Sequence, residues 1–205
     1  MKPFPWSSQH RPSEPPAKLV GAKHFHIRAA KVKDLTNLAE ILTDSFHSRN
    51  GIGGWFYPLL RLGIYEDLRT RLQSNSARYI CLVAVEPVTI RPSDVDLLTG
   101  TVEMSLRSSY PWPLGTTQYP YISNLAVRAQ FRRQGVAQLL LLTCERKALD
   151  WGFPEVYLHV LENNYQARRL YFKLGYRLHQ VDSNWSSWLL GQPRRLLLRK
   201  RLNSS

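Results

Sequence analysis

The sequence of 205 residues has only two cysteines, Cys81 and Cys144, and it lacks any long apolar run. Two cysteines cannot build a disulfide framework or a multi-cysteine metal site, so free thiols in a reducing compartment are expected. No stretch reaches the ~18–20 apolar residues that a membrane-spanning helix needs. The N-terminus has no apolar signal core. We therefore expect a cytoplasmic protein that is neither secreted, fibrous nor membrane-spanning.

Acidic residues are also scarce, with 15 Asp and Glu against 28 Lys and Arg and a net charge of +13. Such a balance suits a polyanionic partner, which includes nucleic acid, an anionic surface or a phosphorylated ligand. A solvated basic face would give the same composition. The arginines and aromatic residues form no RNA-binding signature, so no nucleic-acid partner is expected. Among the scattered histidines, His24 and His26 are too poor a ligand set for a metal.

The chain divides into a tail and one domain. Residues 1–22 carry five prolines and no periodic apolar pattern, which predicts a disordered arm. Residues 23–205 are long enough for one domain with its own core. We expect this domain to be a monomer or a dimer.

The domain shows short strand-like and helix-like segments. We expect strands over 25–28, 79–85, 97–106, 121–127, 156–161, 176–181 and 194–202, and helices over 35–46, 55–73, 134–151 and 164–174. Asp34 is expected to cap the first helix. The second helix is expected to turn Leu59, Leu62, Leu68 and Leu72 inward. Because the strands cluster in runs, the pattern predicts an α/β fold of the α+β type, with about seven strands in a mixed sheet and about four helices.

The most informative segment is the strand 121–127 followed by Arg132-Arg-Gln-Gly135-Val-Ala137 and a long helix. A glycine turn that opens a helix points unpaired N–H groups at one spot, which suits a pyrophosphate. Gly135 permits close approach of a phosphate, and the arginines add positive charge. An ordinary strand–turn–helix junction would have the same pattern. The segment matches neither a P-loop nor a GxGxxG fingerprint.

A second segment has the spacing Asn164-x-x-Ala167-x-x-x-Tyr171-x-x-x-Gly175-Tyr176. The two segments in this order resemble motifs A and B of the GNAT superfamily of acetyl-CoA-dependent N-acyltransferases. The resemblance covers about 25–202, and its specific part is 121–177. It implies a sheet that splays between the strands at 121–127 and 155–161, with acetyl-CoA as cosubstrate and no metal.

The resemblance also implies roles for individual residues. The strand should bulge at Leu125-Ala126-Val127, where its backbone would bond the pantetheine arm and the acetyl carbonyl. Asn164 would contact the pantetheine or cap its helix, and Tyr171 would give a proton to the departing thiolate. The implied cofactor-binding residues are Leu125, Ala126, Val127, Arg132, Arg133, Gln134, Gly135, Val136, Ala137, Gln138, Asn164, Ala167 and Tyr171, of which Arg133 to Gln138 would hold the pyrophosphate with backbone amides.

The general base has more than one candidate. Certain N-terminal protein acetyltransferases resemble this chain at Tyr121, His159 and Tyr171, and the first two can relay the amine proton through water. His159 as a structural core histidine and Tyr121 as a sheet aromatic are the alternative interpretation. Glu103, in the strand after Gly100, is a rival base. Asn124 occupies a position where some relatives have a carboxylate, and an amide cannot act as a base.

The acceptor amine is the least readable feature. Deprotonating a lysine amine near pH 7 costs about 4–5 kcal/mol, against about 1–1.5 kcal/mol for an α-amine. The leading prediction is acetylation of protein N-terminal α-amines and possibly of lysine ε-amines. The cyanobacterial and chloroplast GNAT group, which the chain also resembles, implies the same substrates. In a photosynthetic eukaryote the expected location would be the plastid stroma instead of the cytoplasm. A small-molecule amine (polyamine, amino acid or aminoglycoside) is the second hypothesis, and a non-enzymatic regulatory module the third. Aromatic loops over 47–58, 107–120 and 182–193 are candidate walls of the acceptor site.

Overall fold

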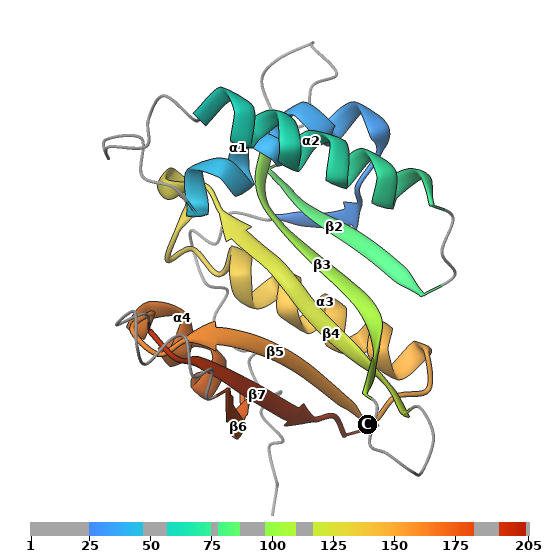
Figure 1. The fold of residues 1–205 in the computed structure, drawn as a ribbon, viewed down its shortest axis with the longest axis vertical. Coiled ribbons are helices and arrows are strands. Elements are labelled where there is room, and N and C mark those ends of the chain that lie inside the picture. The colour runs from blue at the N-terminus through green and yellow to red at the C-terminus, as the bar shows by residue number, and fades with distance from the viewer. Residues whose placement is uncertain are drawn as a thin grey trace, which may run out of the picture.

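A computed structural model describes residues 25–46, 57–74, 78–86, 97–109, 117–182 and 193–203. These residues form one seven-stranded mixed sheet and four α-helices, as the sequence predicted (Figure 1). The arm predicted over 1–22 lies outside the described residues. So do the aromatic side chains of the candidate walls at 47–58 and 182–193, and Tyr110 and Trp112 of the wall at 107–120.

The strands follow the order β1-β2-β3-β4-β5-β7-β6 across the sheet, and every neighbouring pair is antiparallel except β4 and β5. Their bounds are β1 His26–Ala29, β2 Tyr79–Glu86, β3 Leu97–Ser109, β4 Thr117–Val127, β5 Glu155–Leu161, β6 Arg177–Asp182 and β7 Arg195–Arg201. The β3–β4 hairpin is longer than predicted, because Ser109 still pairs with Thr117. Pro120 is tolerated there since β4 has only one neighbouring strand before Tyr121.

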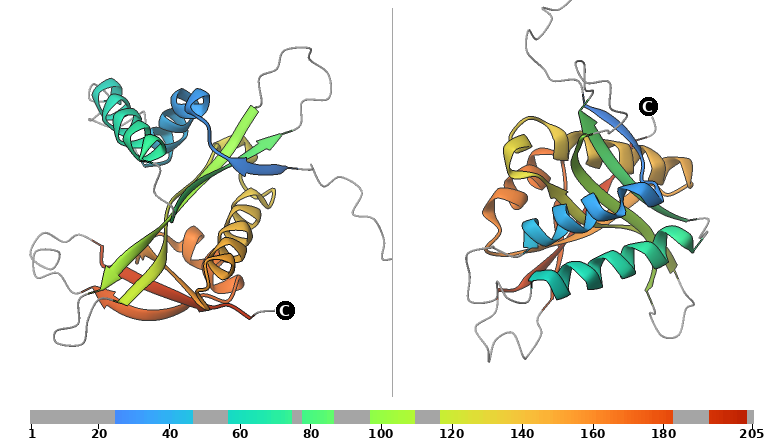
Figure 2. Two further views of the ribbon diagram at one scale, coloured as in Figure 1. Left: turned by 90° about the vertical axis from the view of Figure 1, so that its right-hand side faces the viewer. Right: turned by 90° about the horizontal axis from the view of Figure 1, so that it is seen from above.

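Helices cover both faces of the sheet (Figure 2). On one face lie α1 (Leu35–Phe46) and α2 (Tyr57–Gln73), and on the other lie α3 (Val136–Asp150) and α4 (Tyr165–Lys173). Strand β2 alternates between the two cores, with Val83 packed under α1 and Leu82 packed under α3. Such a strand is apolar along its whole length because both of its faces are buried. No helix in the described part of the chain is long and apolar enough to cross a membrane.

The two cysteines lie in different cores and are free thiols, as predicted. Cys81 on β2 is under α1, and Cys144 on α3 faces the other side of the sheet. Burial, with a smaller contribution from the Glu103 carboxylate, raises the pKa of Cys81 to about 12. Burial likewise raises the pKa of Cys144. Both side chains therefore remain neutral apolar packing groups at neutral pH.

Two local predictions were wrong. Asp34 does not cap α1; its carboxylate accepts hydrogen bonds from Arg28 (2.7 and 3.0 Å) and from the backbone N–H of Lys31 (2.8 Å), and so closes the turn before the helix. Burial alone would raise the pKa of Asp34, but these hydrogen bonds hold it below its usual value. Leu62 is 57% exposed rather than inward. Leu62 is six residues before the buried Leu68, and this separation puts the two side chains about 120° apart around the helix axis.

The backbone feature that shapes the sheet is the separation of β4 from β5. The two strands pair only at Tyr121–Tyr157 and Ile122–Leu158 and then diverge (Figure 1). On its other edge β4 stays paired with β3 as far as Val127, through a β-bulge in which Asn124 and Leu125 together oppose Val102. Asn124 has φ +52°, a left-handed conformation that asparagine tolerates better than most residues. A bulge was predicted in this strand at Leu125-Ala126-Val127, and it lies one residue earlier, at Asn124 and Leu125.

Gly100 allows β3 to lie close to the strand beyond this bulge. A Cβ atom added at Gly100 would be 2.9 Å from the carbonyl oxygen of Ala126 and 3.0 Å from Val136 Cγ1. The first contact is with backbone, which cannot move without shifting β4. The position therefore requires the absence of a side chain.

We expect Gly100→Ala to lower the free energy of unfolding by about 1–3 kcal/mol through overpacking. Gly63→Ala is the matched control, since a Cβ at Gly63 in α2 meets nothing within 4 Å. That change should raise the free energy by about 0.5–1 kcal/mol, because alanine is the better helix former. Urea unfolding followed by circular dichroism measures both. Equal effects at the two glycines would contradict the packing argument.

Candidate functional site

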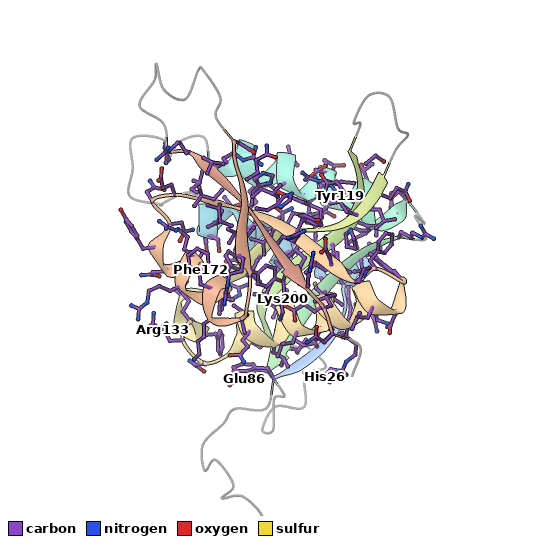
Figure 3. The ribbon with its side chains drawn as sticks, turned by 90° about the horizontal axis from the view of Figure 1, so that it is seen from below. His26, Glu86, Tyr119, Arg133, Phe172 and Lys200 are labelled. Carbon is purple, nitrogen blue, oxygen red and sulfur yellow. The ribbon has the colours of Figure 1, made fainter. Side chains whose placement is uncertain are left out.

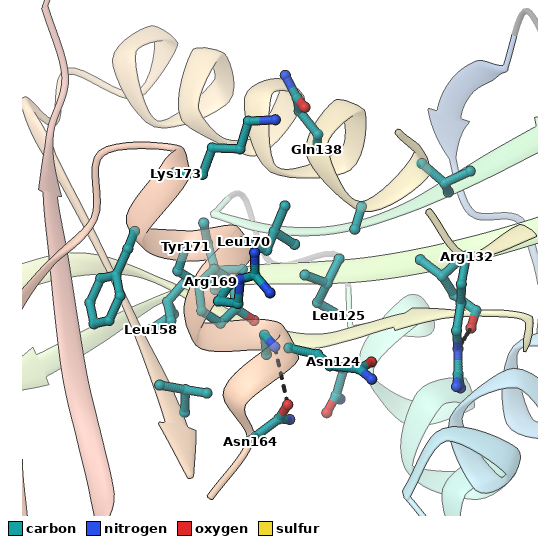
Figure 4. A pocket seen from close by; sticks show the side chains of 18 of the residues that line it. Asn124, Leu125, Arg132, Gln138, Leu158, Asn164, Arg169, Leu170, Tyr171 and Lys173 are labelled. Atoms are coloured by element: carbon teal, nitrogen blue, oxygen red, sulfur yellow. Dashed lines mark hydrogen bonds between the residues drawn. The ribbon is translucent and has the colours of Figure 1, made fainter. Parts of the chain in front are cut away.

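A cleft of ≈ 880 Å³ opens where β4 and β5 diverge. One wall comes from the bulged end of β4 and the beginning of α3, and the other from β5 and α4. Figure 4 shows Leu125 of β4 and Leu170 of α4 on these walls. Figure 3 shows Arg133 and Phe172, which also line the cleft, on the same side of the molecule.

The cleft brings together most of the residues singled out in the sequence. It is lined by Leu125, Val127, Arg132, Arg133, Gly135, Val136, Ala137, Gln138, His159, Asn164, Ala167 and Tyr171. Three predicted residues do not line it. Ala126 packs its side chain in the core under α1, because the bulge turns it to that face. The Gln134 amide donates to the carbonyl of Gln130 (2.9 Å), and Tyr121 is buried beside the cleft.

The first turn of α3 presents backbone N–H groups to the cleft. Gly135 is the N-cap residue with φ +86°, and it has no side chain to occupy those donors. Arg133 also has a positive φ, +65°. The Nε of Arg132 donates to the carbonyl of Val127 (3.1 Å), which holds this guanidinium beside the turn. Free amides, a helix dipole and two arginines together make a site suited to a phosphate-bearing ligand.

Two residues of the second motif have distinct roles on α4. Asn164 caps the helix, since its Oδ1 accepts from the N–H of Ala167 (3.1 Å; Figure 4). Tyr171 is 7% exposed and packs edge-on against Tyr176, with 5.7 Å between ring centroids. Its hydroxyl forms no hydrogen bond with another described residue. Burial, with a smaller contribution from Tyr121, raises the pKa of Tyr171 to about 12, so the phenol keeps its proton at neutral pH.

A chain of polar groups runs across the edge of the cleft from Tyr121 through His159 to Asp182. The Tyr121 hydroxyl lies 2.8 Å from His159 Nδ1. The buried Nε2 lies 3.0 Å from Asp182 Oδ2, although the angle is not that of a well-formed hydrogen bond. A carboxylate oxygen repels a nitrogen lone pair, so this contact favours the tautomer with its proton on Nε2. Nδ1 is then the acceptor for the Tyr121 hydroxyl.

Burial first, and then the charge of Arg195, lower the pKa of His159, while Asp182 acts in the opposite direction. The imidazole is therefore neutral at pH 7 and can accept a proton. The two predicted relay residues are thus in direct contact. Sequence reasoning missed Asp182, because β6 and β7 bring it to His159 from a distant segment without any local motif.

Glu103 has a different environment from the one expected of a base. It is 2% exposed, and its two oxygens accept from Arg71 (2.8 Å), Tyr79 (2.9 Å) and Asn124 (2.7 Å). A guanidinium, a phenol and an amide already occupy this carboxylate, and Glu103 does not line the cleft. The hydrogen bond to Asn124 instead fixes the bulge and ties it to α2 through Arg71. No sequence signal links these residues, since Arg71 is 32 positions from Glu103.

No group of three or more His, Cys, Asp or Glu residues in the described segments could hold a metal ion. The polar groups of the cleft include amide N–H groups, guanidinium groups, the Lys173 ammonium, a phenol and an imidazole. Such groups bind anions and move protons.

Comparison with known sequences agrees with this chemistry. Residues 62–176 match the sequence model of the family described as "Acetyltransferase (GNAT) family". The chain is 29% identical over 192 residues to "GCN5-related N-acetyltransferase 10, chloroplastic" of Arabidopsis thaliana, covering 90% of this chain and 66% of the relative. The chain spans less than two thirds of the length of the curated relatives it matches.

Solved structures share the fold. PaiA N-acetyltransferase from Thermoplasma acidophilum in complex with coenzyme A is 18% identical with a TM-score of 0.63, over 87% of this chain and 99% of that one. Arabidopsis thaliana NAA60 in complex with acetyl-CoA is 20% identical with a TM-score of 0.61, over 88% of this chain and all of that one.

Proposed function

Because the chain belongs to the GNAT acetyltransferase family, we propose that it transfers the acetyl group of acetyl-CoA to a primary amine, most specifically the α-amine of a protein N-terminus. The observation that carries this proposal is the cleft itself. It places an anion-binding helix terminus, a protonated phenol on Tyr171 and a neutral imidazole on His159 around one opening in the sheet. The chloroplastic relatives favour the plastid stroma as the place of action, with the cytoplasm as its counterpart in an organism without plastids.

The residues present fit acetyl-CoA. The first-turn N–H groups of α3 and the guanidinium groups of Arg132 and Arg133 would hold the pyrophosphate. Beyond Ile122 the edge of β4 that faces β5 has no strand partner, so its backbone groups are available to the amides of a pantetheine arm. This bonding would lay the thioester along β4 and lead it toward Tyr171.

The proposed reaction is a direct attack. The neutral amine adds to the thioester carbonyl, and the resulting tetrahedral species loses the thiolate as the C–S bond breaks. One proton must leave the amine nitrogen, and one must reach the sulfur. Backbone N–H groups at the bulge would stabilise the oxyanion, and holding both reactants in one cleft removes much of the entropic cost. Direct attack requires no metal.

Tyr121 and His159 would take the proton from the amine. The Nδ1 lone pair of His159 accepts from the Tyr121 hydroxyl, so a proton arriving at Tyr121, directly or through water, can pass to the imidazole. Asp182 beside Nε2 then faces an imidazolium, which it stabilises. This arrangement is adequate for an α-amine, whose pKa of ~7.7–8 leaves a sizeable neutral fraction at pH 7.

Tyr171 would serve the leaving group. A phenol of pKa about 12 is a weaker acid than a thiol of pKa ~8.5, so complete proton transfer to a free thiolate is uphill by roughly 5 kcal/mol. The main contribution of Tyr171 is therefore a hydrogen bond to the sulfur as negative charge develops on it, and the departing thiolate would take its proton from water. The hydroxyl is available for this role because it has no partner among the described residues.

A small-molecule amine is the second candidate acceptor. Polyamines and aminoglycosides carry several positive charges, and sites for them need carboxylates. None of the described residues that line the cleft is Asp or Glu. Among the described residues, the cleft therefore offers a polycation no carboxylate.

Mass spectrometry of peptides incubated with the protein and acetyl-CoA tests the proposal. Each peptide carries one free α-amine and one internal lysine, and spermidine and an aminoglycoside are included in parallel. We expect acetylation of the α-amine to be fastest. Acetyl-CoA binding with modification of the small amines alone would overturn the peptide assignment.

We expect Gly135→Glu to weaken acetyl-CoA binding by more than about 10²-fold. A carboxylate ~4 Å from a phosphate charge costs about 4 kcal/mol at an effective dielectric of about 20. Gly152→Glu is the control, because Gly152 has the same backbone conformation (φ +84° against +86°) at the other end of α3. Isothermal titration calorimetry should show near-normal binding for this variant. Normal binding by Gly135→Glu would mean that the pyrophosphate lies elsewhere.

We expect Tyr171→Phe to lower kcat by about 10²-fold or more while leaving the Kd for acetyl-CoA nearly unchanged. The missing hydroxyl has no partner among the described residues, so the fold should not suffer. Tyr165→Phe on the same helix is the control, since Tyr165 is 70% exposed. Steady-state kinetics and a binding titration separate the two effects, and an unaltered kcat would remove Tyr171 from the mechanism.

We expect His159→Gln to lower kcat by about 10²-fold and to abolish the acidic limb of its pH profile. The pKa of His159 is lowered, so in the wild type that limb should lie below ~6.5, where the imidazole becomes protonated. His179→Gln is the control, because His179 stacks on Tyr157 in the same sheet but does not contact Tyr121. A wild-type profile in His159→Gln would eliminate the relay.

A further inference from the structure

The Tyr121–His159 pair lies in an excess of positive charge. The guanidinium carbon of Arg107 is 3.4 Å from the centroid of the Tyr121 ring, so the two groups are stacked. Arg195 enters β7 opposite Leu161 of β5, and its charge acts on His159 together with that of Arg107. Among the described residues, Asp182 is the acidic group that acts on this histidine.

These two arginines lack the carboxylate partner that several other arginines have. Arg71, Arg128 and Arg194 each form an ion pair with a carboxylate. Among the described residues, neither Arg107 nor Arg195 has a carboxylate within ion-pair distance. Arg195 lies opposite Asp182 in the β6–β7 register, but Asp182 is close to the imidazole of His159 instead.

The sequence supplies little acid that would neutralise these charges. From residue 104 to 144 and from 183 to 205 there is no Asp or Glu at all. These stretches include the two segments that join β3 to β4 and β6 to β7, which leave the sheet next to Arg107 and Arg195. The positive charge at this end of the sheet would therefore attract an anion from outside the chain.

We propose that Arg107 and Arg195 form an acceptor subsite for a carboxylate, so that the preferred substrates are protein N-termini with Asp or Glu within the first two residues. This inference rests on the proposed function and specifies its acceptor. A guanidinium binds a carboxylate through charge-assisted hydrogen bonds. The same positive field disfavours the ammonium form of the acceptor, which raises the fraction of neutral, nucleophilic amine. A polycationic acceptor is repelled by it.

Two pairs of synthetic peptides test the subsite, each pair matched in size and hydrogen-bonding shape. One pair differs by Glu or Gln at the second position, and the other by Asp or Asn at the first. For the wild-type protein we expect kcat/KM to be roughly tenfold higher for the acidic member of at least one pair. The preference should shrink as salt is raised, because exposed charges are screened.

Arg195→Gln, Arg107→Gln and the double variant should lose this preference while still acetylating the neutral peptides. Activity on the neutral peptides shows that Tyr121 and His159 still function in each variant. This control matters most for Arg107, because it stacks on Tyr121. Arg194→Gln is the matched control. It removes the same charge from the neighbouring position, but its guanidinium is already paired with Glu162 (2.8 Å), so the preference should persist.

Equal kcat/KM for the acidic and neutral peptides in the wild type would overturn the subsite and leave the proposed function intact. A preference that survives in the double variant would also overturn it. Failure to acetylate any peptide, with spermidine consumed instead, would overturn both the subsite and the peptide assignment.

Discussion

The site depends on one missing set of hydrogen bonds, those between β4 and β5 beyond Ile122. An interior strand normally satisfies its backbone groups on both edges, and an edge left open inside a sheet must find other partners. Here β4 keeps β3 on one side as far as Val127, and its other edge faces the cleft. The beginning of α3 and the buried face of α4 are grouped around this opening. The cleft is thus a property of the backbone before any side chain is considered.

The bulge in β4 is stabilised by Glu103 and Arg71, which do not line the cleft. Glu103 is buried in β3 and binds Asn124 on one oxygen and Arg71 on the other. A buried carboxylate is tolerable only when it is paired and hydrogen-bonded, and this one is. The left-handed conformation of Asn124 is therefore stabilised from the face on which α2 packs. Through this contact, movement of α2 would reach the edge of the cleft.

Much of the fold could be predicted from sequence because short-range sequence patterns determine its helices, strands and turns. The strands, the four helices and the turn at Gly135 all have short-range signals in apolar periodicity, glycine and capping residues. For Asn164 the resemblance left two roles open, a contact with the pantetheine or a helix cap, and the structure shows the cap. Contacts between distant segments have no such signal. The Arg71–Glu103 pair and the approach of Asp182 to His159 arise only when strands and helices far apart in the chain pack together, and the exposure of Leu62 depends on which side of α2 meets α1.

The burial of both cysteines also determines how this protein reacts with thiol reagents. The chain has no other cysteine, and burial lifts the pKa of each thiol far above neutrality. A thiolate is the reactive form, so the folded protein should be inert to disulfide reagents and alkylating agents. A chromogenic reagent for free coenzyme A would then follow turnover without a background from the enzyme. The same reagent, added without substrate, would report the rate at which the native core opens.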